Sequence, residues 1–444
     1  MSGTNKSEGT TSRLLEAAEE VLKPQSQRYL DIVDSLEAAH LAAVAESVLV
    51  DNGPAVRDAV EADVRAECQR LRSFMSAAEI IDEVSPRSKD IIISTGEKLS
   101  ARIFTAVLES RGLRAKYFNL DHLIQRDFDE KAIDQSFYDY IAERLAETVA
   151  PFVDSYICVL TGYLGPVPGS LLSTIGRGYT DLTAALMAVA LRADELQIWK
   201  EVDGIFTADP RKAPRARKMA SISPDEAAEL TYYGSEVIHP FTMEQVIRAS
   251  IPIRIKNTFK PEGHGTVILP EGSSLNGSAS PSDLRRSPRA TVKHPTAVTI
   301  KDNVIVLNIH SNRKSVSHGF FAQTFLTLDR FGIVVDLIST SEVHVSMALN
   351  PSVNEESLQK ALKELRKHAT VDVIRDMAIL SLVGKEMRCM VGIASRMFST
   401  LAAHNVNIEM ISQGASEINI SCVIDESSAD VALRAVHDEI VLGE

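Results

Sequence analysis

The sequence has few cysteines, few aromatic residues and no long apolar run. Its 444 residues include four cysteines and one tryptophan, and aromatic residues make up only 5%. The cysteines lie far apart and form no CxxC pair, so neither a zinc cluster nor a disulfide framework is indicated, and reduced thiols are expected. No apolar run reaches the roughly 18 residues that a membrane span needs, and the polar N-terminus lacks the apolar core of a secretion signal. We therefore predict a cytoplasmic protein that does not bind a membrane.

An excess of positive charge is also missing. The 47 lysines and arginines are outnumbered by 60 aspartates and glutamates, which gives a formal net charge of −13. Nucleic-acid binding needs a concentrated positive field, so this balance argues against a nucleic-acid partner. A small anionic substrate can still be held by local basic groups. Apolar residues make up 45% of the chain, enough for real cores, and the length allows roughly two to four domains.

The first 260 residues carry the pattern of an α/β fold. Residues 13–85 show apolar side chains at helical spacing, and short apolar runs then alternate with helical stretches. This rhythm predicts a mostly parallel sheet sandwiched by helices. The predicted strands span residues 91–94, 115–118, 156–160, 196–199 and 251–255.

The last third of the chain contains an internal repeat. Residues 333–339 resemble residues 406–412, and residues 341–346 resemble residues 416–421. Each copy follows an apolar strand and an amphipathic helix, so the repeat predicts two small α+β, ferredoxin-like modules. Because each is too small to be very stable alone, they should pack together or pair with another subunit. The preceding strands span residues 304–309 and 378–383, and the helices span about 319–331 and 392–404.

A linker is predicted between these two parts. Residues 261–294 are rich in turn-forming residues and arginine and poor in apolar residues, which is typical of a solvated surface segment. The predicted domains are therefore residues 1–260, 295–370 and 371–444.

The strongest candidate site is the segment GRGYTD from Gly176 to Asp181. Its glycines flank Arg177 and let the backbone approach a ligand closely, and Thr180 can cap a helix predicted from Asp181 to Ala193. The first amides of that helix and the guanidinium would together attract an anion. A structural glycine turn that holds a surface arginine is the alternative interpretation.

A second candidate is the polar loop after the strand that is predicted to end at Trp199. In open α/β sheets, ligands bind beyond the carboxyl ends of the strands. Lys200 and Arg211 could contact nucleotide phosphates, and Phe206 could pack on a base. A charged surface loop with an internal Lys–Glu pair is the alternative.

Two further residues carry weaker signals. Glu97 follows the predicted strand 91–94 and could bind a substrate ammonium, or it could complement a helix dipole from the first turn. His239 precedes a proline and is more often structural in such a place. The sequence holds neither a GxSxG elbow nor a metal-spaced set of histidines and carboxylates, so no metal ligands are predicted and any metal would be carried by a nucleotide.

Taken in order, these segments resemble the aspartate kinases (aspartokinases) of the amino acid kinase superfamily, most closely the fungal form. The resemblance extends from Glu8 to about Val423 and is strongest from Gly176 to Asn257. That stretch includes ADELQIWKEVDGIFTADPRK and ELTYYGSEVIHPFTMEQVIRASIPIRIKN. The C-terminal repeat resembles the paired ACT domains that make these kinases sensitive to an end-product amino acid, usually threonine in fungal enzymes.

The resemblance implies an activity. The family transfers the γ-phosphoryl group of ATP to the β-carboxylate of L-aspartate, which gives 4-phospho-L-aspartate on the route to homoserine, threonine and methionine. The carboxylate and the polyphosphate repel each other, so the site must supply positive charge, including Mg²⁺ carried with the nucleotide, and must align the two. The resemblance also implies a homo-oligomer that forms through the ACT modules.

Roles for single residues follow from the same resemblance. Arg177 would hold a carboxylate of aspartate, and Asp181 would help to organise the reacting end. Glu97 would lie near the α-ammonium, and Thr10 would lie in the aspartate pocket. The residues implied to hold or flank the nucleotide are Lys200, Glu201, Phe206, Arg211, Glu236 and Val237.

An effector pocket is expected in the repeat. Polar side chains there could hold an α-amino acid, and a solvated turn at the sheet edge is the alternative. The candidates are Asp336, Ser339, Thr340, Glu342 and Asn407.

The sequence lacks one motif of the family. Aspartate kinases carry an early KFGGTS turn, whose lysine stabilises the transferred phosphate and whose glycines cradle the phosphates, and no KFGG occurs here. We expect a misplaced start or a lost exon. The alternatives are a truncated regulatory subunit that senses an amino acid and a paralog that supplies a secondary-metabolite pathway.

Overall fold

The computed structural model describes most of the chain. The described residues are 9–49, 54–128, 134–165, 167, 170, 178–232, 238, 240–270, 294–311, 319–341, 344–414 and 418–443. The chain divides into two compact units, Met1–Leu196 with Glu244–Ile251 and Gln197–Met243 with Pro252–Glu444. Among the described residues, no helix is both long and apolar enough to cross a membrane.

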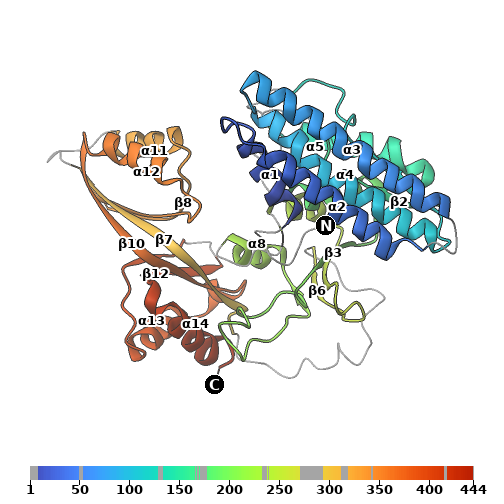
Figure 1. Cartoon of the computed structure of the whole chain (residues 1–444). Helices are drawn as coiled ribbons and strands as arrows, with labels where there is room; N and C mark the ends of the chain where they lie inside the picture. The colour runs from blue at the N-terminus through green and yellow to red at the C-terminus, as the bar shows by residue number, and fades with distance from the viewer. Residues whose placement is uncertain are drawn as a thin grey trace, which may run out of the picture. The chain divides into compact units, whose positions relative to one another are not determined.

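Four helices open the first unit and lie side by side (Figure 1). The helices predicted within residues 13–85 are confirmed, because each of the first three buries one apolar stripe, as Val60, Val64 and Cys68 do on α3. The four helices are α1 (Thr10–Glu20), α2 (Arg28–Ser47), α3 (Pro54–Ile81) and α4 (Pro86–Ser110).

The strand predicted at residues 91–94 is wrong, because these residues lie inside α4. The helix begins at Pro86, and the Ser85 hydroxyl caps it by accepting a hydrogen bond from the backbone N–H of Ser88 at 3.1 Å. Ile92 and Ile93 are both buried, so this stretch of the helix is covered on more than one side. A short apolar run fits a buried helix as well as a buried strand, and the cap here decides for the helix.

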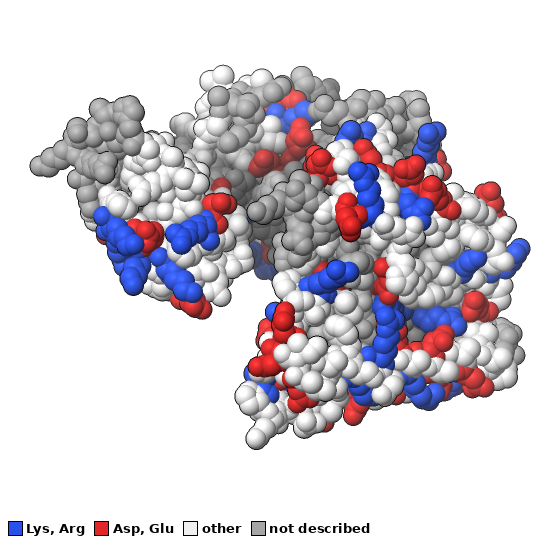
Figure 2. All heavy atoms as spheres, turned by 90° about the horizontal axis from the view of Figure 1, so that it is seen from above, with Lys and Arg blue, Asp and Glu red and all other residues white. Residues whose placement is uncertain are grey.

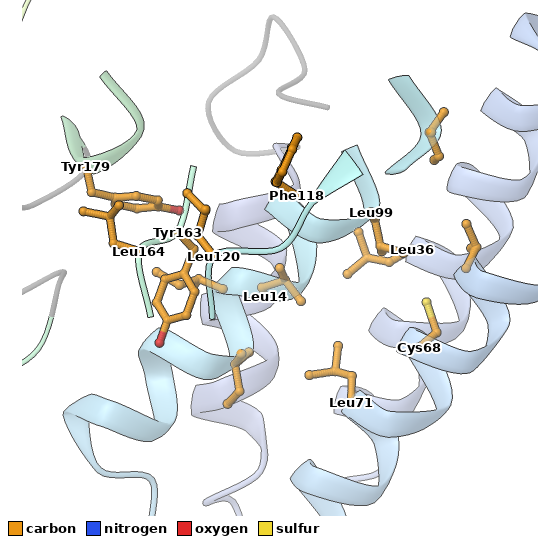
Figure 3. Close-up of a cluster of buried hydrophobic side chains, with 14 of the residues drawn as sticks. Leu14, Leu36, Cys68, Leu71, Leu99, Phe118, Leu120, Tyr163, Leu164 and Tyr179 are labelled. Carbon is orange, nitrogen blue, oxygen red and sulfur yellow. The ribbon is translucent and has the colours of Figure 1, made fainter. Parts of the chain in front are cut away.

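The remaining elements of the first unit surround a two-stranded parallel sheet. The strands predicted at residues 115–118 and 156–160 are confirmed as β1 (Ala115–Phe118) and β2 (Ile157–Leu160). Figure 3 shows the core of this unit, which extends from Cys68 on α3 through Leu14 and Leu99 to Tyr179. The other elements are α5 (Gln135–Val149), η1 (Ala150–Phe152), α7 (Tyr179–Leu191) and α9 (Pro240–Arg248), which crosses from the second unit into the first.

A four-stranded mixed sheet begins the second unit, in the order β3-β5-β6-β4. Strand β6 pairs parallel to β4 and antiparallel to β5. The strands predicted at 196–199 and 251–255 are found as β3 and β5, and β6 lies inside the segment predicted as a linker. The elements are β3 (Leu196–Lys200), β4 (Ser221–Ile222), α8 (Pro224–Tyr232), β5 (Ile253–Asn257) and β6 (Thr266–Ile268).

A six-stranded antiparallel sheet follows, in the order β11-β12-β10-β7-β9-β8. Its two central strands each have 15 residues and are much longer than predicted, because polar residues interrupt their apolar pattern near Asn303 and Asp376. Both residues have a positive φ, and the β7–β10 register shifts between Ile374 and Met377. The strands are β7 (Ala297–Ser311), β8 (Val335–Thr340), β9 (His344–Leu349), β10 (Ala369–Val383), β11 (Met410–Ser412) and β12 (Asn419–Asp425).

The long strands β7 and β10 run through both modules of the repeat. One pair of helices covers one end of these strands, and a second pair covers the other end (Figure 1). Val298 and Ile300 of β7 belong to the core of the second module, so the modules share strands. The helices are α11 (Phe320–Arg330), α12 (Glu355–Leu365), α13 (Ile393–Ala403) and α14 (Ala429–Val436), with the shorter turns η3 (Met387–Cys389), η4 (Glu426–Ser428) and η5 (His437–Val441).

Acidic and basic side chains are interspersed on the face that Figure 2 shows. Some ion pairs join neighbouring helices of the first unit. Arg72 of α3 contacts Asp34 and Glu37 of α2 at 2.6 and 2.5 Å, and Arg102 of α4 contacts Asp63 of α3 at 2.6 Å. Ion pairs near the surface typically contribute at most about 1 kcal/mol each, so the packed apolar stripes hold the helices together.

The buried His40 on α2 makes the stability of the first unit depend on pH. Its Nδ1 lies 2.7 Å from the carbonyl oxygen of Leu36, and its Nε2 has no hydrogen-bond partner among the described residues. Burial lowers the pKa of His40 below the ordinary value of 6.5. At a pH between the pKa of His40 in the folded chain and its pKa in the unfolded chain, the unfolded chain binds more protons. The free energy of unfolding therefore falls as the pH drops below about 6.5.

We predict that His40→Leu reduces this loss of stability at low pH. Urea unfolding at about pH 8 and about pH 5.5 measures it, and His122→Leu, at an exposed histidine of the same unit, is the matched control. If His40→Leu and wild type lost equal stability between the two pH values, the buried imidazole would not be the responsible group.

Candidate active site

A partly buried carboxylate lies where three segments of the first unit meet. Glu97 projects from the middle of α4, not from a strand end as predicted, because α4 continues through residues 91–94. The Tyr179 hydroxyl, at the start of α7, donates a hydrogen bond to Glu97 Oε1 at 3.3 Å. The backbone of Gly162, just beyond β2, also hydrogen-bonds this carboxylate. The loop after a parallel strand and a helix start thus converge on Glu97.

Two glycines make this convergence possible. A Cβ atom on Gly162 would lie 2.3 Å from Thr180 Cγ2 and 3.1 Å from Glu97 Oε2. A Cβ atom on Gly96 would lie 2.9 Å from Thr10 Cγ2. Side chains at these positions would displace the neighbouring groups, so only glycine allows the segments to approach so closely. The structure therefore places the first turn of α7 beside Glu97, and it places Thr10 beside Gly96, the preceding residue on α4.

The electrostatics around Glu97 favour a cationic ligand. Burial raises the pKa of Glu97 above its usual value, and the hydrogen bonds from Tyr179 and Gly162 offset only part of that rise. Both of these partners are neutral groups. A ligand ammonium beside the carboxylate would stabilise its ionised form, which is the chemistry expected for holding an α-amino group.

Helix α7 fixes the other side of the pocket. The Thr183 hydroxyl lies 2.7 Å from the Gly162 carbonyl oxygen, to which it can donate a hydrogen bond, so the loop after β2 is held against the helix. Asp181 lies in the first turn of α7. The helix begins at Tyr179 with Gly178 as its N-cap residue, so the prediction that Thr180 caps it is wrong. Arg177 lies outside the described residues.

The cation nearest to Glu97 in sequence is already engaged. Lys98 is buried, and its Nζ contacts Asp121 at 2.6 Å and Glu67 at 3.3 Å. Breaking such a buried pair would leave an uncompensated charge, so Lys98 serves the structure of the first unit.

A polar loop follows β3 in the second unit, as predicted. Gly204 turns the chain with a φ of 140°, and a Cβ atom there would lie 2.3 Å from the hydroxyl oxygen of Thr266. That hydroxyl instead accepts a hydrogen bond from the backbone N–H of Ile205 at 2.9 Å. Asp203 accepts hydrogen bonds from Asn257 at 2.7 Å and from Lys260 at 3.2 Å. The turn is thus held to β5 and β6.

Four of the predicted nucleotide residues lie on or beside this loop. Lys200 ends β3, and its carbonyl oxygen accepts hydrogen bonds from the backbone and the hydroxyl of Thr258 at 2.9 and 2.7 Å. Glu201 is exposed and Phe206 is half-buried. The Arg211 guanidinium is 88% exposed and pairs with Asp209 at 2.7 Å. The other two predicted residues, Glu236 and Val237, lie outside the described residues.

The predicted effector residues lie at the edges of the six-stranded sheet. Asp336 of β8 forms an ion pair with Lys301 of β7 at 2.6 Å, and both side chains are largely buried. The Asn407 amide, just before β11, donates to Glu409 at 2.7 Å. Leu337 and Met410 share one apolar cluster, so the two edges lie close to each other. The remaining candidates are Ser339 and Thr340, which are exposed on β8, and Glu342, which lies outside the described residues.

Comparison with known proteins identifies the class. The amino acid kinase family matches residues 9–257, and the ACT domain matches residues 380–440. The chain is 51% identical to aspartokinase of Schizosaccharomyces pombe, over 98% of this chain and 84% of that protein. It is 48% identical to aspartokinase of Saccharomyces cerevisiae, over 99% and 84%. The fold and these matches define an amino acid kinase with a C-terminal ACT region.

The structural comparison agrees. The fold is similar to that of E. coli aspartokinase III in complex with aspartate and ADP, with a TM-score of 0.76 and 26% identity over 97% of this chain and 90% of that chain. The chain belongs to the aspartokinase family, whose members are phosphotransferases. These findings do not favour the alternatives of a non-catalytic sensing subunit or a secondary-metabolite paralog.

Several residues of the site escaped the sequence reasoning. Tyr179 lies inside the GRGYTD segment, but nothing in the sequence showed that its hydroxyl would reach Glu97. Gly162 follows the end of a predicted strand. Because ligands bind beyond the carboxyl ends of strands, this position could have identified Gly162 as a site residue. Thr183 lies one turn beyond Tyr179 on the predicted helix, and its bond to the Gly162 carbonyl needs the folded loop.

We predict that Tyr179→Phe weakens aspartate binding about three- to tenfold. The variant removes the hydrogen bond to Glu97 and little volume, and a hydrogen bond to a charged group contributes on the order of 1 kcal/mol. Calorimetric titration with aspartate measures the effect, and Tyr140→Phe on α5 is the matched control. Unchanged affinity in Tyr179→Phe would show that the hydroxyl does not support the pocket.

The raised pKa of Glu97 predicts how this affinity depends on pH. As the pH falls from about 8 towards about 5, Glu97 becomes protonated before an ordinary glutamate does, and aspartate binding weakens. Glu97→Gln should bind weakly at every pH and lose the dependence. A wild-type affinity that stayed constant over this range would contradict the role of the ionised carboxylate.

Proposed function

We propose that this chain phosphorylates the β-carboxylate of L-aspartate with ATP. The observation that supports this best is the partly buried Glu97 carboxylate, which is hydrogen-bonded by Tyr179 and Gly162 between closely packed segments and is suited to bind an α-ammonium. The fungal relatives are named aspartokinases, and the E. coli neighbour was solved with aspartate and ADP.

Binding and orientation are the main tasks of the first unit in this proposal. Glu97 holds the α-ammonium of aspartate, Thr10 lines the pocket, and Arg177 holds a carboxylate. A β-carboxylate oxygen then attacks the γ-phosphorus of ATP, the bond from that phosphorus to the β,γ-bridging oxygen breaks, and ADP leaves. Such a transfer depends on positioning and on charge neutralisation, and Asp181 helps to organise the reacting end.

The loop after β3 binds the nucleotide in this proposal. Lys200 and Arg211 contribute positive charge, Phe206 contributes an apolar surface, and Glu201 with Glu236 and Val237 flank the ligand. The described residues hold no cluster of three or more histidines, cysteines or carboxylates that could bind a metal by itself. In this proposal Mg²⁺ would be bound mainly by the phosphates of ATP and would neutralise charge there.

The ACT region senses an amino acid in this proposal, and the proposed effector is threonine. One E. coli aspartokinase III structure is titled as a complex with lysine and aspartate. Asp336, Ser339, Thr340, Glu342 and Asn407 remain the proposed contacts, and the burial of the Asp336–Lys301 pair makes this carboxylate sensitive to a competing ammonium. We also propose that two copies pair through the ACT modules and that the protein is cytoplasmic. The four free cysteines support a reducing compartment.

The activity is tested with the 444-residue chain. We expect ATP-dependent formation of aspartyl hydroxamate from L-aspartate and hydroxylamine. Arg177→Ala should raise the KM for aspartate about 10- to 100-fold, because a charge-assisted pair to a carboxylate is lost. Arg65→Ala, at an exposed arginine of α3 that pairs with Glu61, is the matched control. No product from the wild-type chain would contradict the activity, and an unchanged KM in Arg177→Ala would remove that residue from its role.

A further inference from the structure

The nucleotide loop is packed into the core of the second ACT module. Ala208 and Ala213 are 4% and 1% exposed, and both belong to the apolar cluster that also contains Leu433 and Val436 of α14. The loop spans residues 205–219 and has no helix or strand of its own, apart from a single bridge between Phe206 and Lys218. Backbone hydrogen bonds of 2.9 Å, from Thr207 to Arg217 and from Met219 to Ile205, hold its two ends together, and contacts with its surroundings fix it in place.

The most specific of these contacts joins Thr207 to the C-terminal segment η5. His437 is fully buried, with Nε2 2.9 Å from Thr207 Oγ1 and Nδ1 2.9 Å from Asp438 Oδ1. The Asp438 carboxylate accepts a hydrogen bond from a protonated Nδ1, and in the neutral imidazole Nε2 then accepts one from the Thr207 hydroxyl. Thr207 Oγ1 in turn accepts from the backbone N–H of Arg217 at 3.0 Å. One hydroxyl thus closes the loop on itself and ties it to η5.

Other contacts secure the same loop. The backbone N–H of Val298 on β7 donates to the Thr207 carbonyl at 2.9 Å. The Lys212 Nζ pairs with Asp302 at 2.6 Å, and its carbonyl accepts from Arg434 Nε at 2.5 Å. The loop is therefore held by β7, α14 and η5, all of which lie in the ACT region of the second unit.

Glu226 makes a similar connection for the following segment. Ser223 caps α8, and the Glu226 carboxylate accepts from its hydroxyl at 2.6 Å, from Thr296 at 2.5 Å and from the backbone N–H of Lys385 at 2.9 Å. Burial raises the pKa of Glu226, but these hydrogen bonds outweigh it and the net pKa is lowered. Helix α8, which leads towards Glu236, is thus joined to the starts of β7 and η3.

We propose that Thr207 and His437 are positioning residues of the nucleotide site. Through their hydrogen bond, the C-terminal segment of the second ACT module holds the loop that carries Phe206 and Arg211. The inference rests on the proposed function, in which this loop binds ATP. It predicts that a change in this module affects nucleotide affinity more than aspartate affinity, because the residues proposed to hold aspartate, Thr10, Glu97 and Arg177, belong to the first unit.

The test compares Thr207→Val with Thr207→Ser in the full chain. Valine keeps the shape of threonine without its hydroxyl, so the dissociation constant for MgADP and the KM for MgATP should rise about three- to tenfold. The kcat and the KM for aspartate should stay within about twofold of wild type. Serine restores the hydroxyl and should restore the affinity. Thr148→Val on α5, whose hydroxyl bonds only the Arg144 carbonyl within its own helix, is the matched control.

Two further measurements separate positioning from folding. His437→Asn should weaken MgADP binding as Thr207→Val does, and the double variant should be no weaker than either single one, because both remove the same bond. Trypsin should cleave Thr207→Val faster than wild type at Arg211, Lys212 and Arg215. If wild type binds MgADP and Thr207→Val binds it equally well, or if the KM for aspartate rises as much as that for MgATP, the positioning role is overturned. If wild type binds no MgADP, the proposed function itself fails, and this inference fails with it.

Discussion

A partly buried carboxylate whose described hydrogen-bond partners are neutral sets the constraint on the first unit. Glu97 lies among packed helices, and removing a charge from water is costly unless hydrogen bonds or an opposite charge compensate it. The Tyr179 hydroxyl and the Gly162 backbone supply part of that compensation. A cation beside the carboxylate would stabilise its ionised form further. The glycines at 96 and 162 follow from the same demand, because Cβ atoms there would lie in contact distance of Thr10, Thr180 and the carboxylate itself.

The second unit contains a long polar loop that has no helix or strand of its own and must still be held in one conformation. The residues from 205 to 219 would lose much conformational entropy on ordering, and the loop has little secondary structure to offset that cost. Buried alanines, the Thr207–His437 bond and the Lys212 pairs provide the compensation, and their partners come from residues 298–302 and 430–441. The ACT region is thus a structural part of the loop's environment. A kinase domain that ended near residue 260 would leave Ala208 and Ala213 without their core.

Features of the fold and the site that depend on residues close together in the sequence could be predicted, and features that depend on distant residues could not. Helical spacing in α1 to α3, the strands β1 and β5 and the internal repeat are local patterns, and they were predicted correctly. The strand predicted at residues 91–94 was wrong, because an apolar run does not distinguish a buried helix from a buried strand. The lengths of β7 and β10 were also predicted wrongly, because polar residues at the bulges interrupt the apolar pattern of each strand. The bond between Thr207 and His437 joins residues 230 apart. No local pattern could reveal it, although the GRGYTD segment and Glu97 pointed to the pocket that the structure assembles.

The shared strands β7 and β10 determine how the two modules can respond to a ligand. Because each strand crosses both modules, neither module can shift along the sheet without breaking hydrogen bonds that it shares with the other. Lys301 lies on β7 near the middle of this shared region. Its Nζ contacts Asp336 at 2.6 Å and the carbonyl oxygen of Tyr232, at the end of α8, at 3.2 Å. One partly buried cation therefore joins the edge of the first module to the helix that leads towards Glu236. Since breaking a largely buried ion pair leaves an uncompensated charge, the Lys301–Asp336 pair helps to hold the edge strand β8 to the central strand β7.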